Sequence, residues 1–309
     1  MDYSKIGYNK PLYILAFDHR ATFAKSMFNL ESADKLSPEQ RHLIKEFKML
    51  IYKGFKDAID KQIPKGKAAI LCDEEFGSEV LIDAKENQFV TILTIEKSGQ
   101  DEFDFMYENF AQHIENYKPT FAKVLIKYNP KDEEDLKKRQ QDKLKTLSDF
   151  CHNNGYKFLL EVLVIPTKEQ LESVNNSREE YDLKLRPELT AEVINVLQSK
   201  GVEPDIWKLE GMETETDYSG VIAEAKSDGR DNVGVVILGR GANEEKVEQW
   251  LEVGSKVKGV VGFAVGRTIF WDCLEKFYKK EIGKAEVIET ISNNFQNFYS
   301  IFTSDKKVG

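Results

Sequence analysis

The chain of 309 residues is 41% apolar and 11% aromatic, which is enough for a sizeable buried core. Its 44 Lys and Arg against 53 Asp and Glu give a net charge of −9, so it has no long-range attraction for nucleic acid or anionic membranes. No apolar run approaches the roughly 18 residues of a membrane span, and the first ten residues lack a signal-peptide core, so we expect a cytoplasmic protein.

Eight short segments rich in Val, Ile, Leu or Phe recur along the chain. Such segments are typical of strands buried on both faces of a parallel sheet. In chain order they are residues 11–18, 67–73, 89–95, 121–127, 156–164, 205–209, 233–239 and 258–265. The sequence therefore predicts eight strands.

Helix-like stretches separate these segments. Ser37 is the predicted N-cap of the first long helix, with Pro38 in its first turn and Gln40 closing a capping box. Further helices are expected over residues 132–154 and 187–200, after Asn243, and from 268 to about 302, where one long amphipathic stretch would cover the last strand.

Strands that alternate with helices predict βαβ units, and eight units in some 300 residues favour a closed barrel. We therefore predict a single (β/α)8 TIM-barrel domain over residues 1–309, with 280–309 as a C-terminal helical extension. The alternative is an open doubly wound sheet. That fold would usually have a Gly-rich phosphate loop after its first strand, and Phe17-Asp18-His19-Arg20 follows here instead.

Three charged residues lie inside otherwise apolar predicted strands: Lys123, Glu161 and Lys208. An ionised group there costs several kcal/mol unless it is paired or neutralised. One interpretation is a buried salt-bridge set that holds the barrel interior together. The other is chemical: one carboxylate cannot neutralise two lysines, and a lysine left beside another cation would become a neutral amine, the nucleophile that attacks a ketone.

Side chains alternate along a strand, so Lys208 shares a face with Ile206 and Glu210, and Lys123 shares one with Phe121 and Lys127. Periodicity alone leaves open which face points into the barrel. Packing Trp207 outward under a helix is the easier arrangement.

Glycine and arginine follow the last two predicted strands. The residues are Gly239, Arg240, Gly241, Gly266 and Arg267. Loops seven and eight of a barrel often hold a phosphate, and glycine lets backbone N–H groups approach an oxyanion. The sequence predicts a phosphate site here, although the glycines are also consistent with simple tight turns.

No histidine spacing typical of a metal site occurs in the sequence, so we expect no metal. The run Asp73-Glu74-Glu75 could hold Mg²⁺, but such runs are usually solvated loops. His19, directly after the first strand, is a weaker catalytic candidate. Three widely spaced cysteines (Cys72, Cys151 and Cys273) predict reduced thiols.

Six segments carry a family resemblance: FDHR at 17–20, CDEEFG at 72–77, AKVLIKYNP at 122–130, FLLEVLVIP at 158–166, DIWKLEG at 205–211 and VGRTIFWD at 265–272. They resemble the tagatose-bisphosphate aldolase family of class I aldolases. They look closer still to the aldolase-like domain fused to the sugar kinase of myo-inositol catabolism. The resemblance covers about residues 10 to 280.

This resemblance implies a class I aldolase without cofactor or metal, in which Lys208 forms a Schiff base with the substrate. It implies that Lys123 lowers the pKa of Lys208 and assists proton transfer, and that Glu161 is the acid or base. Asp18 and Arg20 match the polar group after the first strand.

The resemblance also implies a phosphorylated sugar as the partner. The inositol-pathway reaction cleaves 5-dehydro-2-deoxy-6-phosphogluconate to dihydroxyacetone phosphate and malonate semialdehyde. Lys127 stands where tagatose enzymes tend to have an uncharged residue, so we expect Lys127, Arg20 or Lys97 to bind the carboxylate of that substrate. Barrels of this type often form homo-oligomers.

Two other functions stay open from the sequence. One is an isomerase or epimerase that uses Glu161 and a lysine for proton transfer. The other is a non-catalytic module that binds a sugar phosphate.

Overall fold

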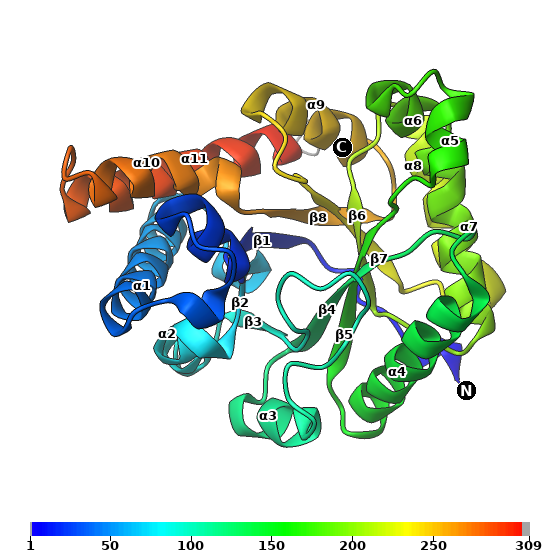
Figure 1. Cartoon of the computed structure of the whole chain (residues 1–309), viewed down its shortest axis with the longest axis horizontal. Helices are drawn as coiled ribbons and strands as arrows, with labels where there is room; N and C mark the ends of the chain where they lie inside the picture. The colour runs from blue at the N-terminus through cyan, green and yellow to red at the C-terminus, as the bar shows by residue number, and fades with distance from the viewer. Residues whose placement is uncertain (1, 305–309) are drawn as a thin grey trace.

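The computed structural model describes residues 2–304, which form a closed barrel of eight parallel strands in the order β1 to β8 (Figure 1). The strands are β1 (Leu12–Ala16), β2 (Ala68–Cys72), β3 (Val90–Thr94), β4 (Phe121–Lys127), β5 (Lys157–Leu163), β6 (Ile206–Glu210), β7 (Gly234–Leu238) and β8 (Val260–Val265). The predicted (β/α)8 barrel is confirmed, and the open sheet is excluded because β1 pairs with both β2 and β8.

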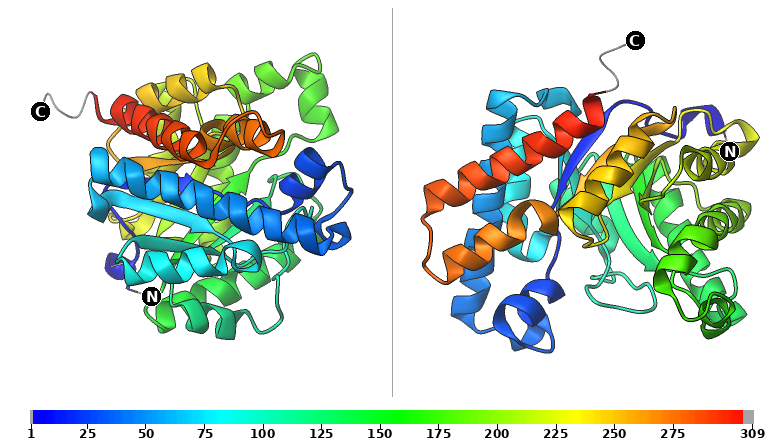
Figure 2. Two further views of the ribbon diagram at one scale, coloured as in Figure 1. Left: turned by 90° about the vertical axis from the view of Figure 1, so that its left-hand side faces the viewer. Right: turned by 90° about the horizontal axis from the view of Figure 1, so that it is seen from above.

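Helices surround the barrel (Figures 1 and 2). They are α1 (Pro38–Lys61), α2 (Glu74–Glu86), α3 (Phe110–Tyr117), α4 (Glu134–Asn153), α5 (Lys168–Ser173), α6 (Arg178–Lys184), α7 (Arg186–Ser199), α8 (Glu215–Ala225), α9 (Glu244–Ser255), α10 (Arg267–Tyr278) and α11 (Lys284–Thr303). The capping box of α1 is confirmed, because Ser37 Oγ accepts from the Gln40 amide and Gln40 Oε1 accepts from the Ser37 amide. No helix in the described part of the chain is both long and apolar enough to cross a bilayer.

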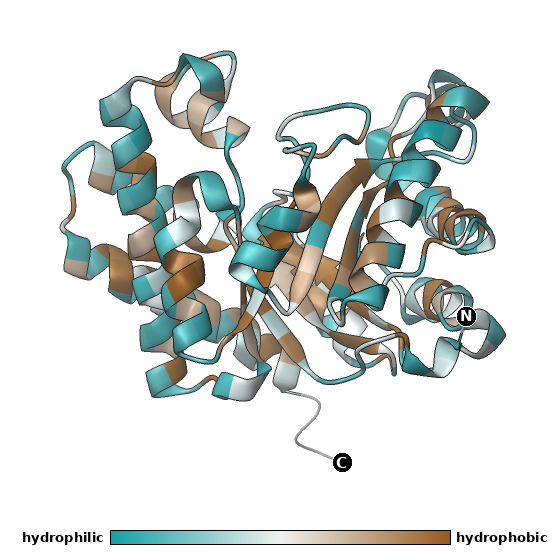
Figure 3. Cartoon of the chain, turned by 90° about the horizontal axis from the view of Figure 1, so that it is seen from below, coloured by the Kyte–Doolittle hydropathy of each residue, from teal (hydrophilic) through white to brown (hydrophobic). Residues whose placement is uncertain are grey.

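Alternation along the strands creates two apolar layers. A small cluster fills the barrel interior, and it includes Ile14, Phe121, Leu159 and Ile206. A larger cluster lies between the strands and the helices. In Figure 3 the strands are mainly hydrophobic, whereas the surrounding helices alternate between hydrophobic and hydrophilic positions, as expected for helices with one face on the core.

The C-terminal region differs from the prediction of one long stretch over the last strand. The chain turns between α10 and α11, where Lys280 has a left-handed φ of 62°. Figure 2 shows α11 lying beside both α10 and α1. Its aromatic residues reach the barrel, since the Phe295 and Phe302 rings contact Phe263 of β8. Because of this turn, α11 covers both β1 and β8.

The acidic run after β2 is not the solvated loop expected from its charge. Asp73 is buried, caps α2 by accepting from the Phe76 amide at 2.9 Å, and forms an ion pair with the buried Lys48. Lys48 also donates to the Phe17 carbonyl at 2.7 Å. Asp73 and Lys48 therefore link α1 and the end of β1 to the start of α2.

The three cysteines are free and buried, as predicted. Burial raises the pKa of the Cys273 thiol to about 12, and a buried thiol with a raised pKa is a poor nucleophile.

Candidate active site

A layer of charged side chains lies next to the interior apolar cluster, on the side of the carboxyl ends of the strands. Phe121, Leu159 and Ile206 belong to the interior cluster. Two residues further along the same three strands stand Lys123, Glu161 and Lys208, which therefore point into the barrel. The register of β5 and β6 pairs Glu161 directly with Lys208. Trp207 faces outward and is fully buried under the helices, as the parity argument favoured.

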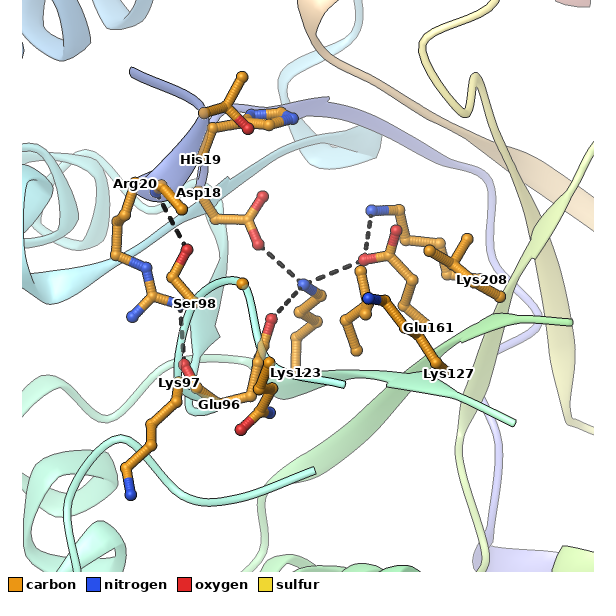
Figure 4. A pocket seen from close by; sticks show the side chains of 16 residues that line it. Asp18, His19, Arg20, Glu96, Lys97, Ser98, Lys123, Lys127, Glu161 and Lys208 are labelled. Atoms are coloured by element: carbon orange, nitrogen blue, oxygen red, sulfur yellow. Dashed lines mark hydrogen bonds and ion pairs between the residues drawn. The ribbon is translucent and has the colours of Figure 1, made fainter. Parts of the chain in front are cut away.

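Lys123 is the centre of this layer (Figure 4). Its Nζ lies 2.8 Å from Asp18 Oδ2, 2.7 Å from Glu96 Oε1 and 3.0 Å from Glu161 Oε2. Lys208 Nζ lies 2.7 Å from the same Oε2 of Glu161. One carboxylate oxygen thus joins the two ammonium groups.

The charge balance corrects the expectation of a surplus lysine. Three carboxylates, those of Asp18, Glu96 and Glu161, surround two lysines, so no lysine of this layer lacks a carboxylate. Burial alone would lower the pKa of Lys123, but the three carboxylates outweigh it and hold that pKa well above its usual value. Lys123 is therefore a permanent cation, and a crowded, unpaired amine does not arise from these contacts.

The neighbouring carboxylates respond to the same charges. Burial alone would raise the pKa of Asp18, but Lys123 and Lys208 hold it well below its usual value. The same two lysines overcome burial at Glu161 and lower its pKa. Asp18 also accepts from Thr94 Oγ1 at 2.8 Å. Asp18 and Glu161 are therefore ionised at neutral pH and able to accept a proton.

Two cavities meet at Lys208, at the carboxyl ends of the strands where barrel enzymes carry their active sites. One has a volume of about 270 Å³ and the other of about 250 Å³. Both are lined by His19, Glu161 and Lys208. An extended molecule could occupy both cavities with its centre beside the amine of Lys208.

The second cavity brings together the predicted phosphate residues, which all line it: Gly239, Arg240, Gly241, Gly266 and Arg267. Gly241 has a φ of 72°, and a Cβ at this position would lie 1.9 Å from Arg267 Nη2. Glycine is thus required for the guanidinium to approach the backbone. Arg267 opens α10, is exposed, and has no ion pair within residues 2–304.

Arg240 is less available than the sequence suggested. Its Nη1 lies 2.7 Å from Asp182, and its Nε lies 2.7 Å from Glu210 Oε1. Asp182 and Glu210 therefore both hold the Arg240 guanidinium in place. Arg240 therefore forms the wall of the cavity, while Arg267 is the cation open to a ligand.

The other cavity is lined by Arg20, Lys97 and Lys127. Arg20 is 3% exposed, and its Nη2 donates to the Glu96 carbonyl at 2.7 Å. Its Nε is buried and has no hydrogen-bond partner. Lys127 forms an ion pair with Asp101, a side chain that is 94% exposed. Three cations therefore line this end of the site. Arg20 contacts a backbone carbonyl, whereas Lys127 and Lys97 pair with the exposed carboxylates of Asp101 and Asp104.

Glu96 is a site residue that the sequence analysis missed, although the alternation of side chains along β3 indicates its position. Ile92 belongs to the interior cluster, and Thr94 and Glu96 follow on the same face of β3 and its extension. The same alternation on β1 leads from Ala16 to Asp18. Extending the parity argument two residues beyond each strand would have found Glu96.

His19 lies between the two cavities. Burial lowers the pKa of His19 to about 4, so its imidazole is neutral at physiological pH. Its Nδ1 is buried without a hydrogen-bond partner. A neutral imidazole with a free nitrogen is suited to contact a hydroxyl group of a ligand. Over residues 2–304 no three His, Cys, Asp or Glu side chains are grouped to hold a metal ion.

Solved structures share this fold across nearly the whole chain. A protein of Corynebacterium glutamicum superimposes with a TM-score of 0.60 at 15% identity, covering 97% of this chain and 88% of that one. A fructose-bisphosphate aldolase from Slackia heliotrinireducens has a TM-score of 0.56 at 13% identity, covering 97% and 87%. An archaeal fructose 1,6-bisphosphate aldolase has a TM-score of 0.54 at 14% identity, covering 96% and 98%. At these identities the likeness establishes the barrel fold alone.

No curated protein matches the sequence significantly. A family model does match, over residues 5–306, and its family is described as an uncharacterized protein conserved in bacteria, DUF2090. Because the match spans nearly the whole chain, this protein belongs to the DUF2090 family.

Proposed function

We propose that this protein is a class I aldolase that cleaves a phosphorylated keto sugar or keto sugar acid through a Schiff base on Lys208. One observation carries the proposal: Glu161 Oε2 lies 2.7 Å from Lys208 Nζ and 3.0 Å from Lys123 Nζ, in the wall shared by two cavities. An amine beside a carboxylate that can take its proton is the arrangement that imine formation needs. The fold shared with a Schiff-base-forming fructose-1,6-bisphosphate aldolase is consistent with it.

Imine formation can proceed with the groups present. The ammonium of Lys208 passes a proton to Glu161, and the neutral amine attacks the ketone carbon. A proton moves from nitrogen to the former carbonyl oxygen, which gives a carbinolamine. Glu161 then returns its proton to the hydroxyl group, water leaves, and an iminium remains on Lys208. The permanent charge of Lys123 keeps Glu161 ionised between these transfers.

Carbon–carbon cleavage follows from the same geometry. Asp18 or Glu161 takes the proton of the β-hydroxyl group, the carbon–carbon bond breaks, and its electron pair moves toward the iminium to give an enamine. The aldehyde leaves. The enamine carbon then takes a proton back from the protonated carboxyl group, and water hydrolyses the imine to free Lys208. Atoms and protons balance over the cycle without another reactant.

The two cavities support a substrate with an anion at each end. Gly239, Gly241, Gly266 and Arg267, with Arg240 in the wall, would bind a phosphate. Arg20 and Lys127 would bind a carboxylate. We propose 5-dehydro-2-deoxy-6-phosphogluconate as the substrate, cleaved to dihydroxyacetone phosphate and malonate semialdehyde. Tagatose 1,6-bisphosphate, which carries a second phosphate instead of the carboxylate, is the alternative.

Borohydride trapping tests the chemistry. Incubation with 5-dehydro-2-deoxy-6-phosphogluconate and borohydride should add a reduced substrate mass to the peptide that contains Lys208. Lys208→Met should abolish the adduct, whereas Lys53→Met, which alters an exposed lysine of α1, should retain it. Isomerisation, or binding without turnover, would give no adduct. An adduct on another lysine would also contradict the assignment.

Substitution of Lys127 tests the substrate. Lys127→Met should lower kcat/KM for the carboxylate-bearing substrate about tenfold, because one charge-assisted contact is lost. Cleavage of a substrate with an uncharged end should change much less. An unchanged kcat/KM for the carboxylate-bearing substrate would show that Lys127 does not bind this group.

A further inference from the structure

Glu96 differs from the two other carboxylates around Lys123. It is 5% exposed, follows β3, and is held by an antiparallel bridge to Phe105. Its Oε1 accepts from Lys123 at 2.7 Å, but its Oε2 is buried and has no hydrogen-bond partner. Asp18, by contrast, accepts from both Thr94 and Lys123, and Glu161 lies between two ammonium groups.

Within residues 2–304, Lys123 is the only cation that forms an ion pair with the carboxyl group of Glu96. Arg20, from the loop after β1, donates to the backbone carbonyl of Glu96 rather than to its side chain. The charged residues of the segment that follows β3 are paired with one another or with outer residues: Lys97 with Asp104, Asp101 with Lys127, and Glu102 with Arg139. Glu96 therefore competes with Asp18 and Glu161 for the single charge of Lys123.

A buried ionised carboxylate with an oxygen that accepts no hydrogen bond is costly, and a protonated carboxyl group avoids most of that cost. We propose that Glu96 carries a proton in the resting enzyme, and that it is a positioning residue which leaves the charge of Lys123 to Asp18 and Glu161. Two lysines then balance two carboxylates in the buried layer. The inference rests on the proposed function only where it concerns catalysis.

The electrostatic surroundings agree with this assignment. Burial raises the pKa of Glu96, and Asp18 adds to the effect, while Lys123 and Arg20 only partly oppose it. The same surroundings lower the pKa of Asp18 and of Glu161, so the three carboxyl groups separate into one acid and two bases. An ionised Glu96 would add a negative charge that holds the proton of Lys208 more tightly. Activity should then fall as Glu96 loses its proton at higher pH.

Infrared spectroscopy can detect the proton directly, because a protonated carboxyl group has a carbonyl band that a carboxylate lacks. Glu210 is a second buried glutamate whose pKa is raised, in its case to about 7, so its band must be removed first. We expect Glu210→Gln protein at slightly acid pH to retain a protonated-carboxyl band, and the additional change Glu96→Gln to abolish it. Glu203→Gln in the same background, which alters a buried glutamate paired with Arg230 outside the Lys123 layer, should leave the band in place.

Three results would overturn the proposal: no such band in Glu210→Gln protein at slightly acid pH, a band that survives Glu96→Gln, or a band abolished by Glu203→Gln. The first requires only a variant outside the Lys123 layer, so poor folding of Glu96→Gln cannot hide it. In catalysis, the decline of kcat at high pH should disappear in Glu96→Gln and persist in Glu96→Asp. The band needs no substrate, so failure of borohydride trapping would overturn the aldolase proposal and leave the protonation of Glu96 standing.

Discussion

Replacing Lys123 by Met is the most direct test of the charged layer. Lys123 is 1% exposed, and the change keeps most of its aliphatic stem while removing an ammonium group that lies within 3.0 Å of three carboxyl groups. Removing one partner of a buried ion pair typically costs about 3–5 kcal/mol, because a buried charge is left without compensation. Three carboxylates share the one cation here, so the loss should lie in that range, limited by proton uptake at the orphaned groups.

The loss should depend on pH in a defined direction. Lys123 helps to lower the pKa of Asp18 and Glu161, so their stabilising contribution is present above the usual carboxyl pKa and is lost as pH falls through the lowered values. The difference between wild type and Lys123→Met should therefore be largest near neutral pH and shrink in acid. Adding Asp18→Asn to Lys123→Met should recover part of the loss, because one orphaned carboxylate is removed.

Urea unfolding followed by circular dichroism at several pH values measures this difference. Lys127→Met is the matched control, because it removes the same group from the same face of β4 where its partner Asp101 is 94% exposed. Such an exposed pair contributes at most about 1 kcal/mol. Equal losses for the two variants, or a loss at Lys123 that stays constant into acid, would refute the assignment of Lys123 as the central cation.

Three further predictions concern other parts of the site. Gly241→Ala should raise KM for a phosphorylated substrate about tenfold in steady-state assays, because φ is 72° and the new Cβ would displace the Arg267 guanidinium. Burial raises the pKa of Glu210 to about 7, so its contribution to stability is present in acid and lost as pH rises toward neutrality. In urea titrations, the free energy of unfolding of Glu210→Gln should therefore rise relative to that of the wild type by at most roughly 3 kcal/mol between acid and neutral pH. Cleavage activity should survive EDTA, because the imine on Lys208 is the electron sink, and abolition of turnover by EDTA would contradict that chemistry.

Local pattern predicted the barrel and much of its site. The eight strands and the capping box at Ser37 depend on rules that act over a few residues. Alternation along a strand likewise decides which side chains share a face. The interior apolar cluster of the structure then shows that Lys123, Glu161 and Lys208 are on the inward face, which the alternation alone left open.

The balance of charge was decided only by closure of the barrel. Asp18 and Glu96 are 105 and 27 residues from Lys123 in the chain, yet both contact its ammonium group because β1, β3 and β4 converge at one end of the barrel. Because of these contacts, three carboxyl groups surround the two lysines, whereas the sequence had suggested one carboxyl group for two lysines. Sequence alone determined which side chains share a face of each strand, but only the closed barrel shows which face points inward. Ion pairing also depends on distances of a few ångströms between strands, and those distances exist only once the sheet has closed.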